Sequence, residues 1–129
     1  MLHERHYTAE QANDVLPLVR ATVRRLQRAK RKLSEQGFDP GFAALTEVVG
    51  GAWPGRTRAE SALEAALGFE HLERLDLVVR DLDAGLIDFP ALRDGREVYL
   101  CWHLDEPTVG HWHGAETGFA GRLPLDPWL

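Results

Sequence analysis

The first quarter of the chain carries apolar residues at helical spacing. These positions alternate by three and four residues, which places them on one face of a helix: Ala12, Val15, Leu16, Val19, Val23, Leu26 and Leu33. Thr8 and Gln11 have the spacing of a capping box, in which two side chains satisfy the first free amides of a helix. We therefore expect a long helix over about 9–35, kinked or started late by Pro17 and ended by Gly37.

A second helical pattern follows a stretch that is rich in glycine and proline. An Asp-Pro start predicts a short helix over 39–49, and the glycine-rich residues 50–55 are predicted to form a loop. Apolar spacing then predicts a helix over about 58–74. Two long helices joined by a connection form an antiparallel hairpin, here over 8–75 with a loop-rich middle.

After Asp76 the pattern changes to the alternation of period two that is typical of strands. The predicted strands are 77–80, 86–89, 97–104 and 109–113. Pro90 is expected to stop the second strand, and the proline-containing tail is expected to be extended. Helices followed by strands predict an α+β fold, in which the long helical hairpin packs on an antiparallel sheet of about four strands. We expect a single domain over 1–129, with 76–129 as its β-rich half.

Composition narrows the class of protein. The 129 residues are 44% hydrophobic and 27% charged, which is typical of a globular domain. No run of about 18 apolar residues is present, so we expect no membrane span, and the start lacks the apolar core of a signal peptide. Cys101 is the only cysteine. A chain with no possible internal disulfide fits a cytoplasmic location, and cysteine-rich zinc sites are excluded.

Charge is divided unevenly along the chain. Residues 1–36 hold eight Lys and Arg against four acids, whereas residues 37–129 hold seven against sixteen, for a net charge of −5. Arg20, Arg24, Arg28 and Arg31 fall on one helical stripe. This stripe would suit a phosphate backbone, but it equally suits a solvated face or pairing with the acidic second helix. Aromatic residues do not interleave with it, so nucleic-acid binding is the less favoured interpretation.

Several segments of the strand half resemble a known family. They are Asp83–Pro90, Asp94–Trp102, Glu106–Pro107, Trp112–His113 and Gly118–Arg122. With the opening Tyr7–Asn13 they resemble a small bacterial family, the domain of unknown function 2203, over roughly 7–34 and 75–125. The resemblance implies an uncharacterised function. In this family the position of His103 is more often arginine and His111 is less typical, whereas His113 matches. A site that needs all three histidines would be peculiar to this protein.

A cluster of potential metal ligands lies in the strand half. His103, His111 and His113 fall within eleven positions, and Cys101 and Glu106 are close in sequence. Imidazole, thiolate and carboxylate groups bind divalent transition metals such as zinc. His111 and His113 are two apart on one strand, so they share a face, and further ligands would come from His103, Cys101, Glu106 or Asp88.

Strand register decides whether this cluster forms. An odd number of unpaired residues in the turn places Cys101 across from His111 and Tyr99 across from His113. An even number separates the histidines onto opposite faces. We expect the odd register, because it puts Trp102 and Trp112 together on the apolar face. The alternative interpretation is that the histidines only form hydrogen bonds on a partly exposed sheet face.

Charged residues nearby form a second candidate set. Asp88 lies in a short apolar strand and needs a partner if it is buried, for which Arg96 or Arg122 is available. The same three residues are candidates for binding an anionic ligand. Cys101, between Leu100 and Trp102, is expected to be a buried inert thiol rather than a nucleophile.

These patterns favour a binding protein over an enzyme. No serine-hydrolase or nucleotide-binding motif occurs in the chain, so catalysis has no recognisable support. We expect a module that binds a small ligand or a divalent metal on the His/Cys outer face of the sheet. The alternative is a structural or interaction protein that forms a homodimer through the helical hairpin. Nucleic-acid binding through the Arg20–Lys32 face ranks third.

Overall fold

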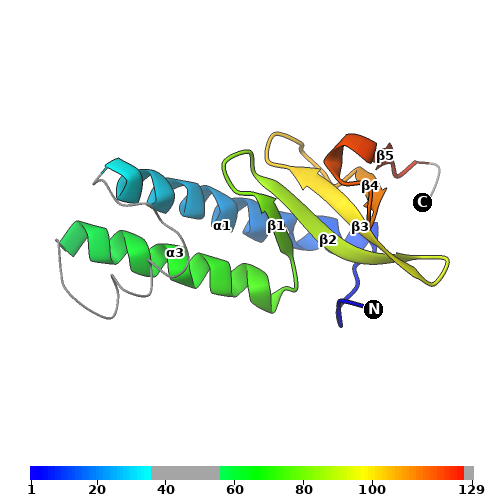
Figure 1. The fold of residues 1–129 in the computed structure, drawn as a ribbon, viewed down its shortest axis with the longest axis horizontal. Coiled ribbons are helices and arrows are strands. Elements are labelled where there is room, and N and C mark those ends of the chain that lie inside the picture. Colours follow the sequence, from blue (N-terminus) through cyan, green and yellow to red (C-terminus); the bar gives the residue numbers. More distant parts are fainter. Residues whose placement is uncertain (36–55, 127–129) are drawn as a thin grey trace. The chain divides into compact units, whose positions relative to one another are not determined.

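The computed structural model describes residues 1–35 and 56–126 of the chain (Figure 1). These residues form two helices and a five-stranded sheet, which confirms the α+β class. By its contacts the chain divides into two compact units, residues 1–20 with 72–129 and residues 21–71. None of the described helices is both long and apolar enough to cross a membrane.

The two helices match the apolar pattern closely. Helix α1 (Ala9–Glu35) passes Pro17 as one uninterrupted helix, and helix α3 covers Arg56–Arg74. The capping box forms as expected, because the amide of Gln11 donates to Thr8 Oγ1 at 3.1 Å and the amide of Thr8 donates to Gln11 Oε1 at 3.0 Å. The helix end at Gly37, the short helix over 39–49 and the loop over 50–55 lie outside the described residues.

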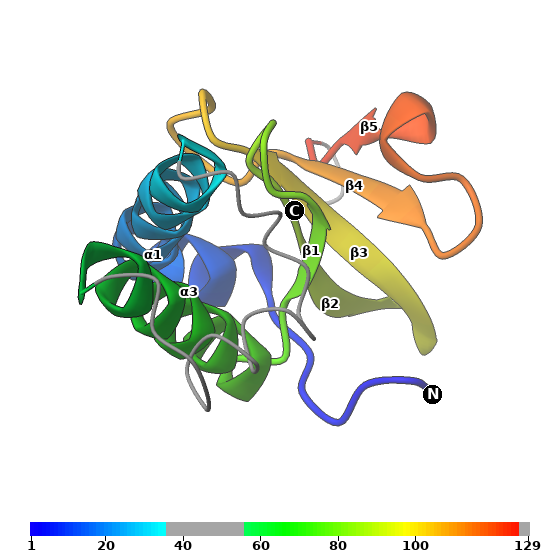
Figure 2. The ribbon, with the colours of Figure 1, turned by 60° about the vertical axis from the view of Figure 1, so that its left-hand side comes forward.

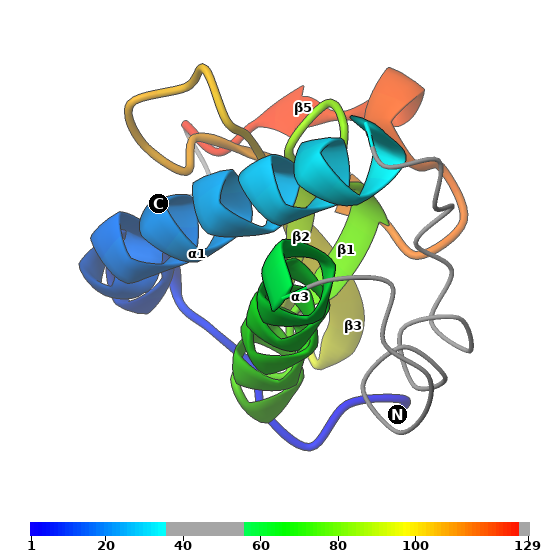
Figure 3. The same cartoon turned by 90° about the vertical axis from the view of Figure 1, so that its left-hand side faces the viewer.

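Within residues 21–71, the second half of α1 contacts α3 (Figure 3). A Cβ added to Gly68 would lie 2.7 Å from Leu26 Cδ2, so the absence of a side chain permits this close approach. Thr22 Oγ1 lies 3.2 Å from His71 Nδ1. These contacts form the helical hairpin that the sequence predicts.

The sheet has the sequential order β1-β2-β3-β4-β5 with antiparallel pairs throughout (Figure 2). Its strands are β1 (Val78–Asp81), β2 (Leu86–Arg93), β3 (Arg96–His103), β4 (His111–Gly114) and β5 (Leu123–Pro124). The count is five rather than about four, because part of the expected extended tail pairs with β4 as β5. Just before it, Phe119–Gly121 forms a 3-10 turn, η1.

The β3–β4 register is the odd one. Cys101 pairs with His111, and Tyr99 pairs with His113. Trp102 and Trp112 therefore share the other face, where Trp102 is fully buried. Side chains alternate along a strand, so one face of the sheet is apolar and the other carries the polar cluster.

The first half of α1 lies against the apolar face and the turn after β3. The side-chain amide of Asn13 donates to the Val109 carbonyl, and its oxygen accepts from the Val109 amide at 2.7 Å. Arg20 donates to the carbonyls of Glu106 and Pro107. These bonds fix the loop that sets the register of β4.

Pro90 does not stop β2, contrary to expectation. The strand continues to Arg93, and Pro90 pairs with Tyr99. Its carbonyl accepts from the amide of Tyr7 at 2.7 Å, on the side away from β3. In an antiparallel strand the N and O of one residue point to the same side, so the missing N–H of Pro90 removes no bond to β3.

Candidate metal centre

Three buried side chains converge on the polar face, one from each of three adjacent strands. Asp88 on β2, Cys101 on β3 and His113 on β4 offer ligand atoms that all lie within 4.8 Å of one another. Each residue is at most 2% exposed. Asp88 and Cys101 are direct cross-strand partners. We call this group the triad.

His113 has an oxygen at each ring nitrogen. Its Nδ1 lies 2.7 Å from the carbonyl oxygen of Gly114, and its Nε2 lies 2.7 Å from Oδ2 of Asp88. A carbonyl only accepts, so Nδ1 carries the hydrogen. A separation of 2.7 Å is that of a hydrogen bond, so a proton lies between Nε2 and Oδ2.

Arg80 on β1 supports the carboxylate of Asp88. Its Nε donates to Asp88 Oδ2 at 2.8 Å, and its guanidinium lies 4.9 Å from the centre of the Tyr99 ring. Burial works to lower the pKa of Arg80, but the hydrogen bond and charge of Asp88 raise it above its usual value. The sequence predicts Arg96 or Arg122 as the partner of Asp88. The partner is Arg80 because β1 pairs with β2 beside Asp88.

Cys101 is a poor nucleophile in this setting. Burial, and then the negative charge of Asp88, raise the pKa of its thiol to about 12. A thiol attacks as thiolate, so this shift opposes nucleophilic chemistry. The ring nitrogens of His113 are also engaged with Gly114 and Asp88, which leaves no ring nitrogen to act as the base of a Cys-His-Asp catalytic arrangement.

A small cavity of about 90 Å³ adjoins the triad. Besides the triad it is lined by Arg80, Leu86, Gly118 and Phe119. Gly118 has a φ of 64°, a backbone conformation that glycine adopts without strain, and it leads into η1. Phe119 is 45% exposed, so its ring forms an outer wall of the cavity.

His111 belongs to a separate group around Arg122, which His103 joins only through its backbone amide. Arg122 donates to the carboxylate of Glu106 and to Nδ1 of His111. Arginine only donates, so Nδ1 of His111 accepts this bond. The backbone amide of His103 donates to Glu106 Oε1 at 2.9 Å. A guanidinium thus occupies the centre of the group that contains Glu106 and His111.

The predicted anion-binding residues are likewise divided. Asp88 belongs to the triad, and Arg122 belongs to the neighbouring group. Arg96 is exposed beside the hairpin turn at the other end of β3, where it pairs with Arg93. The structure therefore does not bring Asp88, Arg96 and Arg122 to one point.

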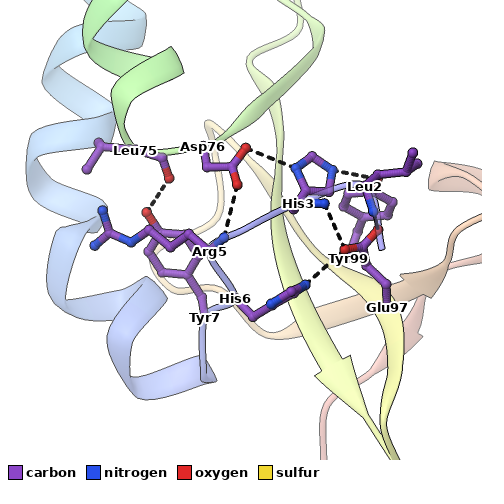
Figure 4. A network of polar contacts seen from close by, with 9 residues as sticks. All are labelled: Leu2, His3, Arg5, His6, Tyr7, Leu75, Asp76, Glu97 and Tyr99. Carbon is purple, nitrogen blue, oxygen red and sulfur yellow. Dashed lines mark hydrogen bonds and ion pairs between the residues drawn. The ribbon is translucent and has the colours of Figure 1, made fainter.

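A polar network links the start of the chain to Asp76, Glu97 and Tyr99 (Figure 4). His3 bridges two groups, with Nδ1 at 3.0 Å from Asp76 Oδ1 and Nε2 at 2.9 Å from the hydroxyl of Tyr99. The Tyr99 ring stacks on His113, with centroids 5.5 Å apart. Local sequence patterns do not find this network, because His3 is 73 and 96 residues away from its two partners.

Two carboxylates anchor this opening segment. Glu97 accepts from the amides of Leu2 and His3 and from the ring of His6. Burial opposes ionisation of Glu97, but these bonds lower its pKa below the usual value. The pKa of Asp76 is lowered in the same way, against the effect of burial, by bonds from His3 and the Arg5 amide.

Comparison with known proteins assigns the chain to a family. No curated protein matches the chain, and no solved structure does. The model of the family described as "Uncharacterized conserved protein (DUF2203)" matches residues 5–125, which include the triad, Arg80 and Phe119. Asp88, Cys101 and His113 also lie in segments that carry the resemblance noted from sequence. The chain therefore belongs to the DUF2203 family.

Proposed function

We propose that the protein binds a divalent transition metal, with zinc as the best match, through Asp88, Cys101 and His113. The observation that carries the proposal is the approach of His113 Nε2 to Asp88 Oδ2 with Cys101 Sγ within 4.8 Å. Nitrogen, sulfur and carboxylate oxygen are the zinc ligands found in proteins. A bound zinc ion would replace the proton between His113 Nε2 and Asp88 Oδ2 and would hold the two atoms farther apart, because each ligand bond is about 2.0 Å long in tetrahedral geometry.

The surroundings of His113 support this proposal. Metal-binding histidines usually donate their second ring N–H to a carbonyl or carboxylate, which fixes the ring. In this protein the Gly114 carbonyl holds that position at 2.7 Å. Three protein ligands beside a cavity leave a fourth position open, which is the pattern of sites that bind a water or a small molecule.

Binding requires the thiol of Cys101 to lose its proton. The pKa of about 12 describes the thiol without a metal, and a coordinated thiol is deprotonated outright. The metal charge is then balanced by the thiolate and by Asp88. Arg80 orients the carboxylate through its hydrogen bond, although its positive charge weakens the attraction of the site for a cation.

Titration with Co²⁺ tests the proposal directly. Wild-type protein should take up one equivalent and develop a thiolate-to-cobalt charge-transfer absorption, because Cys101 supplies the sulfur. The Cys101→Ser variant should lose this absorption. Cobalt binding without a charge-transfer band in the wild type would contradict the assignment of Cys101 as a ligand.

A second candidate function is self-association as a homodimer through the helical hairpin. It is supported by Leu63 and Leu67, which lie one turn apart on α3 and are 49% and 56% exposed. Sedimentation equilibrium over a hundredfold range of concentration should show a dimer that the Leu63→Gln, Leu67→Gln double variant weakens. A monomer at every concentration would contradict this function.

Nucleic-acid binding has the least support. Arg20 donates to two backbone carbonyls, and Arg25 lies 3.8 Å from Glu64, so part of the basic stripe contacts the protein itself. Nucleic-acid binding would be supported if the affinity for RNA or DNA fell steeply with salt concentration and was lost when the charges of Arg24 and Arg28 were reversed.

A further inference from the structure

We infer that the open position of the triad takes a small monovalent oxyanion, of the size of formate, acetate or bicarbonate, and that Arg80 holds its second oxygen. The inference rests on the proposed metal site and specifies its ligand class. It is carried by three features of the cavity, namely its charge, its volume and its walls.

The charge of the site favours a single negative charge on the ligand. A divalent metal is neutralised by the thiolate of Cys101 and the carboxylate of Asp88. Arg80 then leaves one positive charge beside the cavity that it lines. This net positive charge attracts a monovalent anion and does not attract a neutral ligand in the same way.

Arg80 has the geometry for this role. Its Nε donates to Asp88 and the guanidinium also interacts with Tyr99, which leaves further N–H bonds on its terminal nitrogens. A terminal N–H of arginine can donate a charge-assisted hydrogen bond to the oxygen that the metal does not hold. The side chain is 45% exposed, so its outer part is reachable from solvent, whereas Asp88 beneath it is buried.

Volume and walls limit the size of the ligand. The cavity of about 90 Å³ is well below the roughly 300–1,000 Å³ that is typical of sites for larger ligands, so a ligand of a few non-hydrogen atoms fits. Leu86 and Phe119 supply apolar walls. These walls accept the methyl group of acetate, and the Phe119 ring excludes a larger aromatic acid.

The experiment uses the full chain loaded with Co²⁺, whose visible absorption reports the fourth ligand. Formate, acetate and bicarbonate are titrated separately, with acetamide as the neutral match for acetate and benzoate as the oversized acid. Arg80→Gln removes the proposed anchor, and Arg96→Gln removes an exposed arginine on β3 as a matched control. Cobalt stoichiometry and the far-ultraviolet circular dichroism are recorded first for every variant.

The small anions should change the cobalt spectrum with saturation, and acetamide and benzoate should not. Loss of a charged hydrogen bond at Arg80→Gln should weaken acetate about tenfold or more, whereas Arg96→Gln should leave its affinity unchanged. Phe119→Ala should admit benzoate. Equal responses to acetate and acetamide, or equal affinities in both arginine variants, overturn the inference while the metal site stands. If cobalt does not bind the wild type, the metal site and the inference both fail.

Discussion

His113 and Asp88 meet across an intervening strand, with Nε2 and Oδ2 2.7 Å apart and both side chains 2% exposed. They stand on β4 and β2, and β3 between them carries Cys101. Strands β2 and β4 are two strand spacings apart, roughly 9–10 Å, and the two residues are also offset along the strands, because the row of Asp88 and Cys101 continues to His111. The two side chains therefore extend toward each other over β3. They meet in a small buried space beside the thiol of Cys101.

Replacing Asp88 should destabilise the protein even without metal. Asp88→Asn leaves Arg80 and His113 without their charged acceptor, and removal of one partner from a buried ion pair costs about 3 kcal/mol. Urea unfolding in the presence of a chelator measures the loss. Asp105→Asn is the control, because its side chain is 89% exposed and the expected change is below about 0.5 kcal/mol. Equal losses in the two variants would contradict the assigned role of Asp88.

Cys101 should resist thiol reagents in the folded protein. Burial and the pKa of about 12 keep the group protonated and covered at neutral pH. A chromogenic disulfide reagent at pH 7.5 should label less than a tenth of the protein in the time that labels unfolded protein completely. Rapid labelling of native protein would show that the thiol is accessible or ionised.

Acidification should release the opening segment. The pKa values of Glu97 and Asp76 are lowered by folding, so their contribution to stability is complete above the unfolded pKa of about 4 and is lost as pH falls through the lower folded value. Unfolding midpoints in urea between pH 6 and pH 3 should fall for the wild type. The Glu97→Gln variant should start lower and fall less. Parallel curves would contradict the coupling.

Two turn glycines should differ in their tolerance of alanine. Gly85 has a φ of +72°, and an added Cβ would lie 2.5 Å from the Cβ of Leu104. Gly95 has a φ of +77° with nothing within 4 Å of an added Cβ. Gly95→Ala should cost about 1 kcal/mol of stability for the left-handed backbone alone, and Gly85→Ala about 3 kcal/mol because the chain must also move. Thermal unfolding of both variants checks this order, and a reversed order would contradict it.

Much of the fold follows from local sequence patterns. The capping box at Thr8 and Gln11 and the apolar spacing mark the start and extent of α1, because both depend on residues within a few positions. An odd number of unpaired residues in the turn after β3 places Trp102 and Trp112 on the same apolar face. This register correctly predicts that Cys101 pairs with His111. The continuation of β2 through Pro90 cannot be predicted from neighbouring residues. It depends on the hydrogen bond from the amide of Tyr7, far away in the sequence, to the carbonyl of Pro90.

Local sequence patterns predict only part of the candidate site. Cys101, His113 and Asp88 are identified by residue type, but the register alone does not separate them from His103, His111 and Glu106. That separation depends on Arg122, which arrives from the tail and binds the second group. Arg80 and His3 carry no local signal of their role, because strand pairing and a long-range contact bring them to the polar face.

Elemental analysis of untagged protein tests the central claim most directly. The protein is purified without chelator or a nickel column, dialysed against zinc and then against metal-free buffer. Wild type and His111→Ala should each retain close to one zinc per chain, and His113→Ala should retain almost none, although the two histidines are only two residues apart on β4. A wild-type protein without zinc, or equal retention in the two variants, would contradict a metal site at Asp88, Cys101 and His113.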